Sequence, residues 1–100
     1  MQVEIDHLDS PQNIIMPKGA FFVFQNEQRL AEMQYTWAGE DKFIIDNTTV
    51  DESLRGQNVG GQLLDRLVAF AREKQVKVIP LCPFAKSVFD KDPSIRDVLY

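Results

Sequence analysis

The first half of the chain alternates apolar and polar positions with the period of β-strands. Residues 21–25 are aromatic or β-branched and lie between turn residues, which predicts a strand. In residues 31–37 apolar side chains alternate with polar ones, so we expect a strand with one buried face. A loop of hairpin length that contains Gly39 precedes residues 42–50, which predict a third strand. Three antiparallel strands in a meander are the simplest arrangement of these segments.

The second half changes to the period of a helix. Its apolar residues recur at spacings of three and four, at Leu63, Leu64, Leu67, Val68, Phe70 and Ala71. This pattern predicts a helix over residues 62–75, followed by a β-branched strand over residues 76–81. A helix between two strands is a crossover, and a right-handed crossover makes the strands that it joins parallel. A short helix from Pro83 to Asp92 and a last turn over residues 94–100 complete the expected elements.

These predictions combine to an α+β fold, in which a small, mostly antiparallel sheet is followed by a glycine loop, a crossover helix and a parallel strand. The length of 100 residues fits one domain over residues 1–100, with a poorly defined N-terminal segment at residues 1–17. Within that segment we expect a short strand at residues 3–5, a turn at residues 9–11 and a sheet edge at residues 14–16.

Composition narrows the classes of function. The formal net charge of −4 argues against a nucleic-acid binder, which normally has a clustered basic surface. The longest apolar runs are too short to span a bilayer, and the first residues lack the basic and apolar regions of a signal peptide. Cys82 is the single cysteine, so no internal disulfide and no multi-cysteine metal cluster can form. We expect a cytoplasmic protein without a metal, a nucleic-acid partner or a membrane partner.

The polar segment before the predicted helix is the candidate for ligand binding. It contains Arg55, Gly56, Gly60 and Gly61 between a strand and a helix. The first N–H groups of a helix have no internal partner, and glycines let a phosphate approach the backbone closely. Arg55 adds a cation suited to bidentate phosphate contact. The same glycines could instead serve only the turn and the packing of the helix. The spacing fits neither a P-loop nor a Rossmann fingerprint.

The segment Arg55-Gly56-Gln57-Asn58-Val59-Gly60-Gly61-Gln62 resembles the acetyl-coenzyme A pyrophosphate loop of the GCN5-related N-acetyltransferases, Gln/Arg-x-x-Gly-x-Gly/Ala. Arg55 matches the first position and Gly60 the last. Asn58 replaces the middle glycine, and asparagine is the residue that best tolerates left-handed backbone in its place. The resemblance implies an acetyltransferase-like domain that binds acetyl-CoA as co-substrate and transfers acetyl to an unidentified amine. It further implies that the N–H groups of Gln57, Asn58, Val59, Gly60, Gly61 and Gln62 bind the pyrophosphate.

A narrower resemblance joins this loop to Asn47-Thr48-Thr49-Val50 and to Ile79-Pro80-Leu81-Cys82-Pro83-Phe84. The three segments together are similar to small, truncated acetyltransferase-like proteins of the YjdJ type. This resemblance implies that main-chain groups of Thr49, Val50 and Asp51 bind the pantetheine arm, and that Cys82 lies near the thioester. Asn47 stands where members of the small family commonly have a histidine.

The residues leave the chemistry open. Cys82 is a candidate nucleophile that accepts acetyl from the thioester, but a lone cysteine among apolar neighbours is more often a small buried residue. His7 is more often a surface residue than a base, and Asp51 and Glu52 are candidate bases only through their nearness to the loop. The alternatives to an enzyme are a non-catalytic coenzyme A binding module or partner subunit, and an interaction domain that kept only the fold. The oligomeric state is open.

Overall fold

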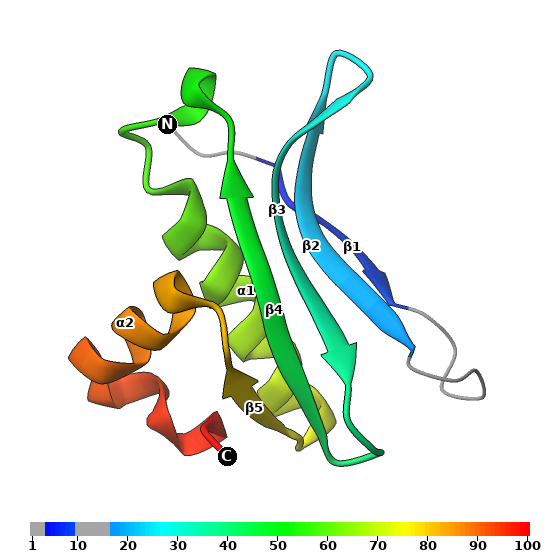
Figure 1. Ribbon diagram of the computed structural model, residues 1–100, viewed down its shortest axis with the longest axis vertical. Coiled ribbons are helices and arrows are strands. Elements are labelled where there is room, and N and C mark those ends of the chain that lie inside the picture. Colours follow the sequence, from blue (N-terminus) through cyan, green and yellow to red (C-terminus); the bar gives the residue numbers. More distant parts are fainter. Residues whose placement is uncertain (1–3, 10–16) are drawn as a thin grey trace.

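A computed structural model describes residues 4–9 and 17–100, which form a mixed sheet with helices (Figure 1). The elements in chain order are β1 (Asp6–Asp9), β2 (Lys18–Gln25), β3 (Gln28–Trp37), β4 (Lys42–Val50), the 3₁₀ turn η1 (Glu52–Leu54), α1 (Val59–Lys74), β5 (Lys77–Pro80), α2 (Pro83–Lys91) and the 3₁₀ segment η2 (Pro93–Val98). Among the described residues, no helix is both long and apolar enough to span a bilayer.

The five strands lie in the order of the sequence, β1-β2-β3-β4-β5. The first three pairings are antiparallel, and β5 returns beside β4 in parallel after the crossover through α1. The predicted α+β fold, its meander and its parallel strand are therefore confirmed. Figure 1 shows α1 behind the sheet, where it packs on β2, β3 and β4, while α2 lies beside β4 and β5. The core between α1 and the sheet contains Phe21, Met33, Tyr35, Phe43, Ile45, Leu63, Leu64 and Leu67.

The helix α1 begins at Val59, three residues before the predicted start at Gln62. The prediction was wrong there because Gly60 and Gly61, which weaken a helix, lie inside its first turn rather than in the loop. At the other end the helix stops at Lys74, because Gln75 adopts the left-handed conformation of a helix C-cap (φ 58°). The following strand covers Lys77–Pro80, within the predicted 76–81.

The first described strand is β1 at Asp6–Asp9, whereas Glu4 and Ile5 of the predicted strand at residues 3–5 lie outside it and residue 3 is outside the described residues. The predicted turn at residues 9–11 and the predicted sheet edge at residues 14–16 lie largely outside the described residues. The expectation of a surface His7 was wrong. Its ring is half-buried, stacks on Phe21 with 4.0 Å between ring centroids, and lies with Nε2 2.7 Å from the hydroxyl of Tyr35.

Tyr35 connects β1 to the core through hydrogen bonds. Its hydroxyl donates to Asp9 Oδ1 at 2.7 Å, and the indole N–H of Trp37 donates to the same oxygen at 2.8 Å. A phenol has one proton, so the Tyr35 oxygen accepts from His7 Nε2, which fixes the tautomer of that ring. Burial lowers the pKa of His7 and raises the pKa of Tyr35, so both groups are neutral at pH 7. This network holds the edge strand β1 in register.

Candidate functional site

A β-bulge in β4 determines which side chains of this strand line the candidate site. Gln34 of β3 pairs with Asn47, whereas Tyr35 pairs with Ile45, so Asp46 is an extra residue at a β-bulge. The bulge shifts the alternation of side chains by one residue. Phe43 and Ile45 face the core before it, and Thr48 and Val50 face the helix-covered side after it, where both line a pocket. Asp46 points to the opposite face and accepts a 2.5 Å hydrogen bond from the Thr36 hydroxyl.

The edge of β4 toward β5 is open beyond the bulge. The parallel pairing with β5 ends at Ile45 and Pro80, and the N–H of Cys82 donates to the carbonyl of Ile45 at 3.0 Å as the last link. From residue 47 to residue 50, β4 pairs only with β3 among the described residues. Alternate residues of a strand direct their main-chain groups to opposite edges, so part of this segment presents N–H and C=O groups to the open edge.

Asp51 ends the strand and is already fully engaged. Its N–H donates to the carbonyl of Leu30 at 2.6 Å, and its own carbonyl accepts from Leu54 at 3.0 Å. The side chain of Ser53 and its N–H, which donates to Asp51 Oδ2 at 3.0 Å, both stabilise the carboxylate and lower the pKa of Asp51. The N–H of Asp51 is therefore not available to a pantetheine arm, and Asp51 is a weak base because it stays ionised as the cap of η1. Since alternate residues of a strand direct their main-chain groups to opposite edges, those of Thr49 face β3, as the N–H of Asp51 does, and those of Val50 face the open edge.

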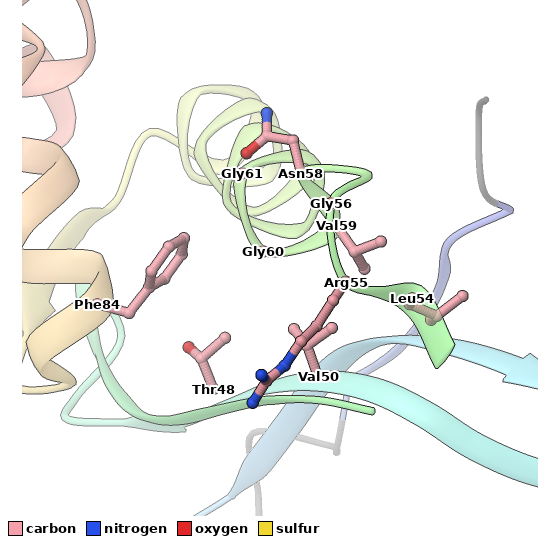
Figure 2. Close-up of a pocket in the computed structure, with 10 residues that line it drawn as sticks. All are labelled: Thr48, Val50, Leu54, Arg55, Gly56, Asn58, Val59, Gly60, Gly61 and Phe84. Carbon is pink, nitrogen blue, oxygen red and sulfur yellow. The ribbon is translucent and has the colours of Figure 1, made fainter. Parts of the chain in front are cut away.

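The loop between η1 and α1 turns on two residues with positive φ. Gly56 has φ 83°, and Asn58 has φ 54° and ψ 40°, the left-handed conformation that the sequence predicts asparagine to tolerate here. The Asn58 side chain makes no capping hydrogen bond to the helix. In Figure 2 it points away from Thr48 and Val50. The replacement of glycine by Asn58 therefore keeps the turn and leaves the start of the helix uncovered.

Three main-chain amides at the start of α1 are free. Within residues 4–9 and 17–100, no hydrogen bond is found for the N–H groups of Val59, Gly60 and Gly61. The first turn of α1 also carries no acidic residue, so the partial positive charge of the helix end is not neutralised there. The N–H of Gln62, by contrast, donates to the carbonyl of Asn58 at 3.0 Å, and its side-chain amide donates to the carbonyl of Gln57 at 2.9 Å. Gln62 thus braces the loop, and the free donors are residues 59–61.

These amides border a pocket of about 390 Å³ (Figure 2). Its lining comes from the end of β4, the loop, the start of α1 and the start of α2: Thr48, Val50, Leu54, Arg55, Gly56, Asn58, Val59, Gly60, Gly61 and Phe84. Figure 2 shows the Arg55 side chain reaching across the opening toward β4. Its side chain is 76% exposed. Its Nη1 lies 3.9 Å from Oε1 of Glu52, which is exposed as well, so this ion pair is weak. Neither desolvation nor the ion pair therefore opposes a contact between Arg55 and an anion strongly.

Cys82 lies just behind this pocket. It precedes α2 as the N-cap residue, is 3% exposed, and is not among the residues that line the pocket. Its Sγ donates to the Thr48 hydroxyl at 3.2 Å, and Thr48 does line the pocket. The favoured expectation of a buried cysteine is confirmed. The structure also places the thiol one side chain from the cavity, next to the bulge of β4.

Among residues 4–9 and 17–100, no histidine or carboxylate borders the pocket. The single histidine, His7, is held in the network with Tyr35 and Asp9, on β1 at the edge of the sheet opposite to β5. Asp51 is occupied as a cap, and Glu52 is exposed and does not line the pocket. In the described part of the chain, no group of three or more His, Cys, Asp or Glu side chains is placed to hold a metal ion.

Comparison with known proteins gives the family. The sequence profile of the family described as GCN5-related N-acetyl-transferase matches residues 20–98. The chain belongs to this family. A GCN5-like candidate N-acetyltransferase from Staphylococcus aureus, solved by NMR, is 35% identical to it and superposes with a TM-score of 0.72 over 98% of this chain and 88% of that chain. The truncated acetyltransferase fold is thereby established, while the narrower YjdJ-type resemblance stays a prediction.

A second solved structure of the family shares the fold alone. It is the crystal structure of an acetyltransferase from Elizabethkingia anophelis with acetyl-CoA bound, 16% identical, with a TM-score of 0.56 over 76% of this chain and 63% of that chain. No curated protein matches the sequence.

Sequence reasoning missed two residues of this acetyltransferase-like site. Thr48 was missed because the bulge at Asp46, which turns its side chain toward the helices, has no sequence signature. Phe84 was missed because its contact with Gly60 joins elements that are far apart in the chain. Tight packing at Gly60 was the available signal, since a glycine in a helix often marks close approach of a neighbour.

Proposed function

We propose that the protein binds acetyl-CoA at the start of α1 and transfers its acetyl group to an amine acceptor. The observation that carries this proposal is the row of free amides at Val59, Gly60 and Gly61 beside the exposed Arg55 guanidinium. Convergent N–H donors at a helix N-terminus with one flexible cation are the arrangement that binds a diphosphate. Family membership supports the same ligand.

We call the free amides of Val59, Gly60 and Gly61 together with Arg55 the diphosphate cradle. The pantetheine arm would leave this cradle along the open edge of β4. Val50 lies on the segment that lacks a partner toward β5 and directs its main-chain groups to that edge, where an extended amide-bearing chain can pair with them as a strand would. The edge leads from the cradle to Thr48 and to the bulge. The thioester would therefore arrive beside the Cys82 thiol, which contacts Thr48.

Two routes lead from that geometry to product. In one, the Cys82 thiolate attacks the acetyl carbonyl, the bond from that carbon to the coenzyme sulfur breaks, and coenzyme A leaves as the thiol after taking up a proton. The amine then attacks the cysteine thioester and restores the thiol. In the other, the deprotonated amine attacks acetyl-CoA directly, and water or the leaving thiolate takes the proton. Mass spectrometry of the intact protein separates these routes, because only the first gives an acetylated Cys82 peptide.

Calorimetric titration with acetyl-CoA tests the binding. We expect saturable binding that Arg55→Ala weakens by about tenfold, as for the loss of one charge-assisted phosphate contact. Arg29→Ala is the matched control, because Arg29 is a half-exposed arginine on β3 outside the pocket. Equal weakening by both substitutions, or no binding by the unmodified protein, would contradict the proposal.

A non-catalytic coenzyme A binding module is the second candidate. The absence of a histidine or free carboxylate from the lining of the described pocket, together with the burial of Cys82, favours it. Turnover with a panel of small amines, polyamines and basic peptides distinguishes the two. An enzyme releases coenzyme A at a rate that depends on the amine, whereas a module binds acetyl-CoA and releases none.

A further inference from the structure

The ring of Phe84 lines the pocket between the two helices. Phe84 follows Pro83 at the start of α2, and its ring packs directly on the backbone of Gly60 in the first turn of α1. A Cβ atom on Gly60 would lie 2.8 Å from the ring Cζ, so a side chain there would have to displace the ring. Figure 2 shows the ring between α2 and the helix start, above Thr48.

The ring is the movable part of this contact. The backbone at Phe84 is held in the first turn of α2, where its carbonyl accepts from the Ser87 hydroxyl at 2.7 Å. Phe84 is 37% exposed, so part of its ring already borders solvent, and a change of rotamer can carry the ring further outward. Such a rotation opens the space between Gly60 and Thr48 without unfolding either helix.

The thiol of Cys82 is buried behind the pocket, and Cys82 is not among the residues that line it. Cys82 is 3% exposed, and the nearest group of the pocket is the Thr48 hydroxyl that its Sγ contacts. A ligand held at Gly60 and extending toward Cys82 runs along the pocket wall that Phe84 and Thr48 form. Neither residue carries charge, so the barrier is steric and is set by the aromatic ring.

We propose that Phe84 is an aromatic gate that closes the way from the diphosphate cradle to Cys82 and turns outward when the thioester arm enters. The identity of the arm rests on the proposed function, whereas the closure of the thiol by the ring does not. Closed and open states are then in equilibrium, and the ligand affinity is reduced by the fraction of closed molecules.

Labelling of Cys82 by a maleimide in the ligand-free protein measures the gate directly. We expect Phe84→Ala to raise the labelling rate by about tenfold, which corresponds to a shift of about 1.4 kcal/mol in the opening equilibrium. Phe84→Trp is expected to lower the rate. Leu81→Ala is the matched control and leaves the rate unchanged, since Leu81 is 66% exposed, is next to Cys82 and does not line the pocket.

Two measurements keep this test independent of protein stability and of the proposed function. Labelling is repeated in low urea, because a rate that follows opening of the ring is insensitive to urea and one that follows global unfolding rises with it. Calorimetry is expected to give tighter acetyl-CoA binding for Phe84→Ala than for Phe84→Trp. Equal labelling rates for the unmodified protein, Phe84→Ala and Phe84→Trp overturn the gate, even where acetyl-CoA binds. Faster labelling of Phe84→Ala without any acetyl-CoA binding supports closure by the ring and contradicts the proposed function.

Discussion

The side chain of Asn58 lies against the Cα atom of Gly61. A Cβ atom at Gly61 would be 2.5 Å from Asn58 Oδ1 and 2.7 Å from Nδ2. The left-handed backbone of Asn58 directs its carboxamide back over the first turn of α1, away from the pocket. The two residues are therefore coupled: with asparagine at position 58, a side chain at position 61 must displace the carboxamide.

This coupling predicts that the effect of Gly61→Ala on the free energy of unfolding depends on the residue at position 58. In the Asn58→Gly background the substitution is expected to stabilise the protein by up to about 1 kcal/mol, because alanine favours a helix. With Asn58 present the new methyl group must displace the carboxamide, which we expect to cancel or reverse that gain, giving a coupling of about 1 kcal/mol. Urea unfolding of the four proteins measures it. The same effect of Gly61→Ala in both backgrounds would show that the two residues are independent.

The network at His7 predicts a pH-dependent stability. Burial lowers the pKa of folded His7 below its ordinary value of 6.5, and nearby Arg66 and Lys74 lower it further, while Asp9 acts in the opposite direction. The unfolded chain therefore binds the proton more readily than the folded protein. The stability that neutral His7 contributes is complete above about pH 6.5 and is lost as the pH falls toward the lowered value, with a slope of at most about 1.4 kcal/mol per pH unit.

His7→Gln removes the titration while keeping a neutral amide that can donate to Tyr35. The difference in unfolding free energy between the unmodified protein and this variant is expected to change in favour of the variant between pH 6.5 and pH 5. Chemical denaturation across this range measures the difference. A constant difference would mean that His7 titrates alike in the folded and unfolded protein.

A second consequence of this network is the requirement for glycine at position 19. A Cβ there would overlap the Tyr35 ring and lie 2.7 Å from the carbonyl oxygen of Leu8. The Leu8 carbonyl is part of the backbone and the Tyr35 ring is fully buried, so neither can move away from a new methyl group. We therefore expect Gly19→Ala to destabilise the protein by about 2–3 kcal/mol. Tyr35→Phe is not expected to rescue it, because the ring carbon as well as the hydroxyl is in the way. Thermal unfolding of the single and double variants tests both statements.

Much of the fold follows from local sequence pattern. The alternation in residues 31–37 and the leucine spacing of the helix act within a single element, and they identified β3 and α1. The left-handed turn at Asn58 was likewise predictable, because it depends on the residue's own backbone preference. The bulge at Asp46 was not predictable, since it depends on how β3 and β4 pair.

The same distinction holds for the site. The sequence pointed to Arg55 and to the glycines, but not to which amides are free. Asp51 and Gln62 proved to be engaged through contacts with Leu30 and Asn58 that only the folded chain forms. The position of His7 was mispredicted for the same reason, because its partner Tyr35 is 28 residues away in the sequence.

An NMR titration with coenzyme A gives the most direct test of the central claim, that the first turn of α1 binds the diphosphate. The amide signals of Val59, Gly60 and Gly61 are observed in ¹⁵N-labelled protein as coenzyme A is added, with those of Gly39 and Gly19 as internal references. The account predicts large, saturable shifts at residues 59–61 and small ones at the references. Saturable shifts elsewhere, with the amides of residues 59–61 unmoved, would contradict it.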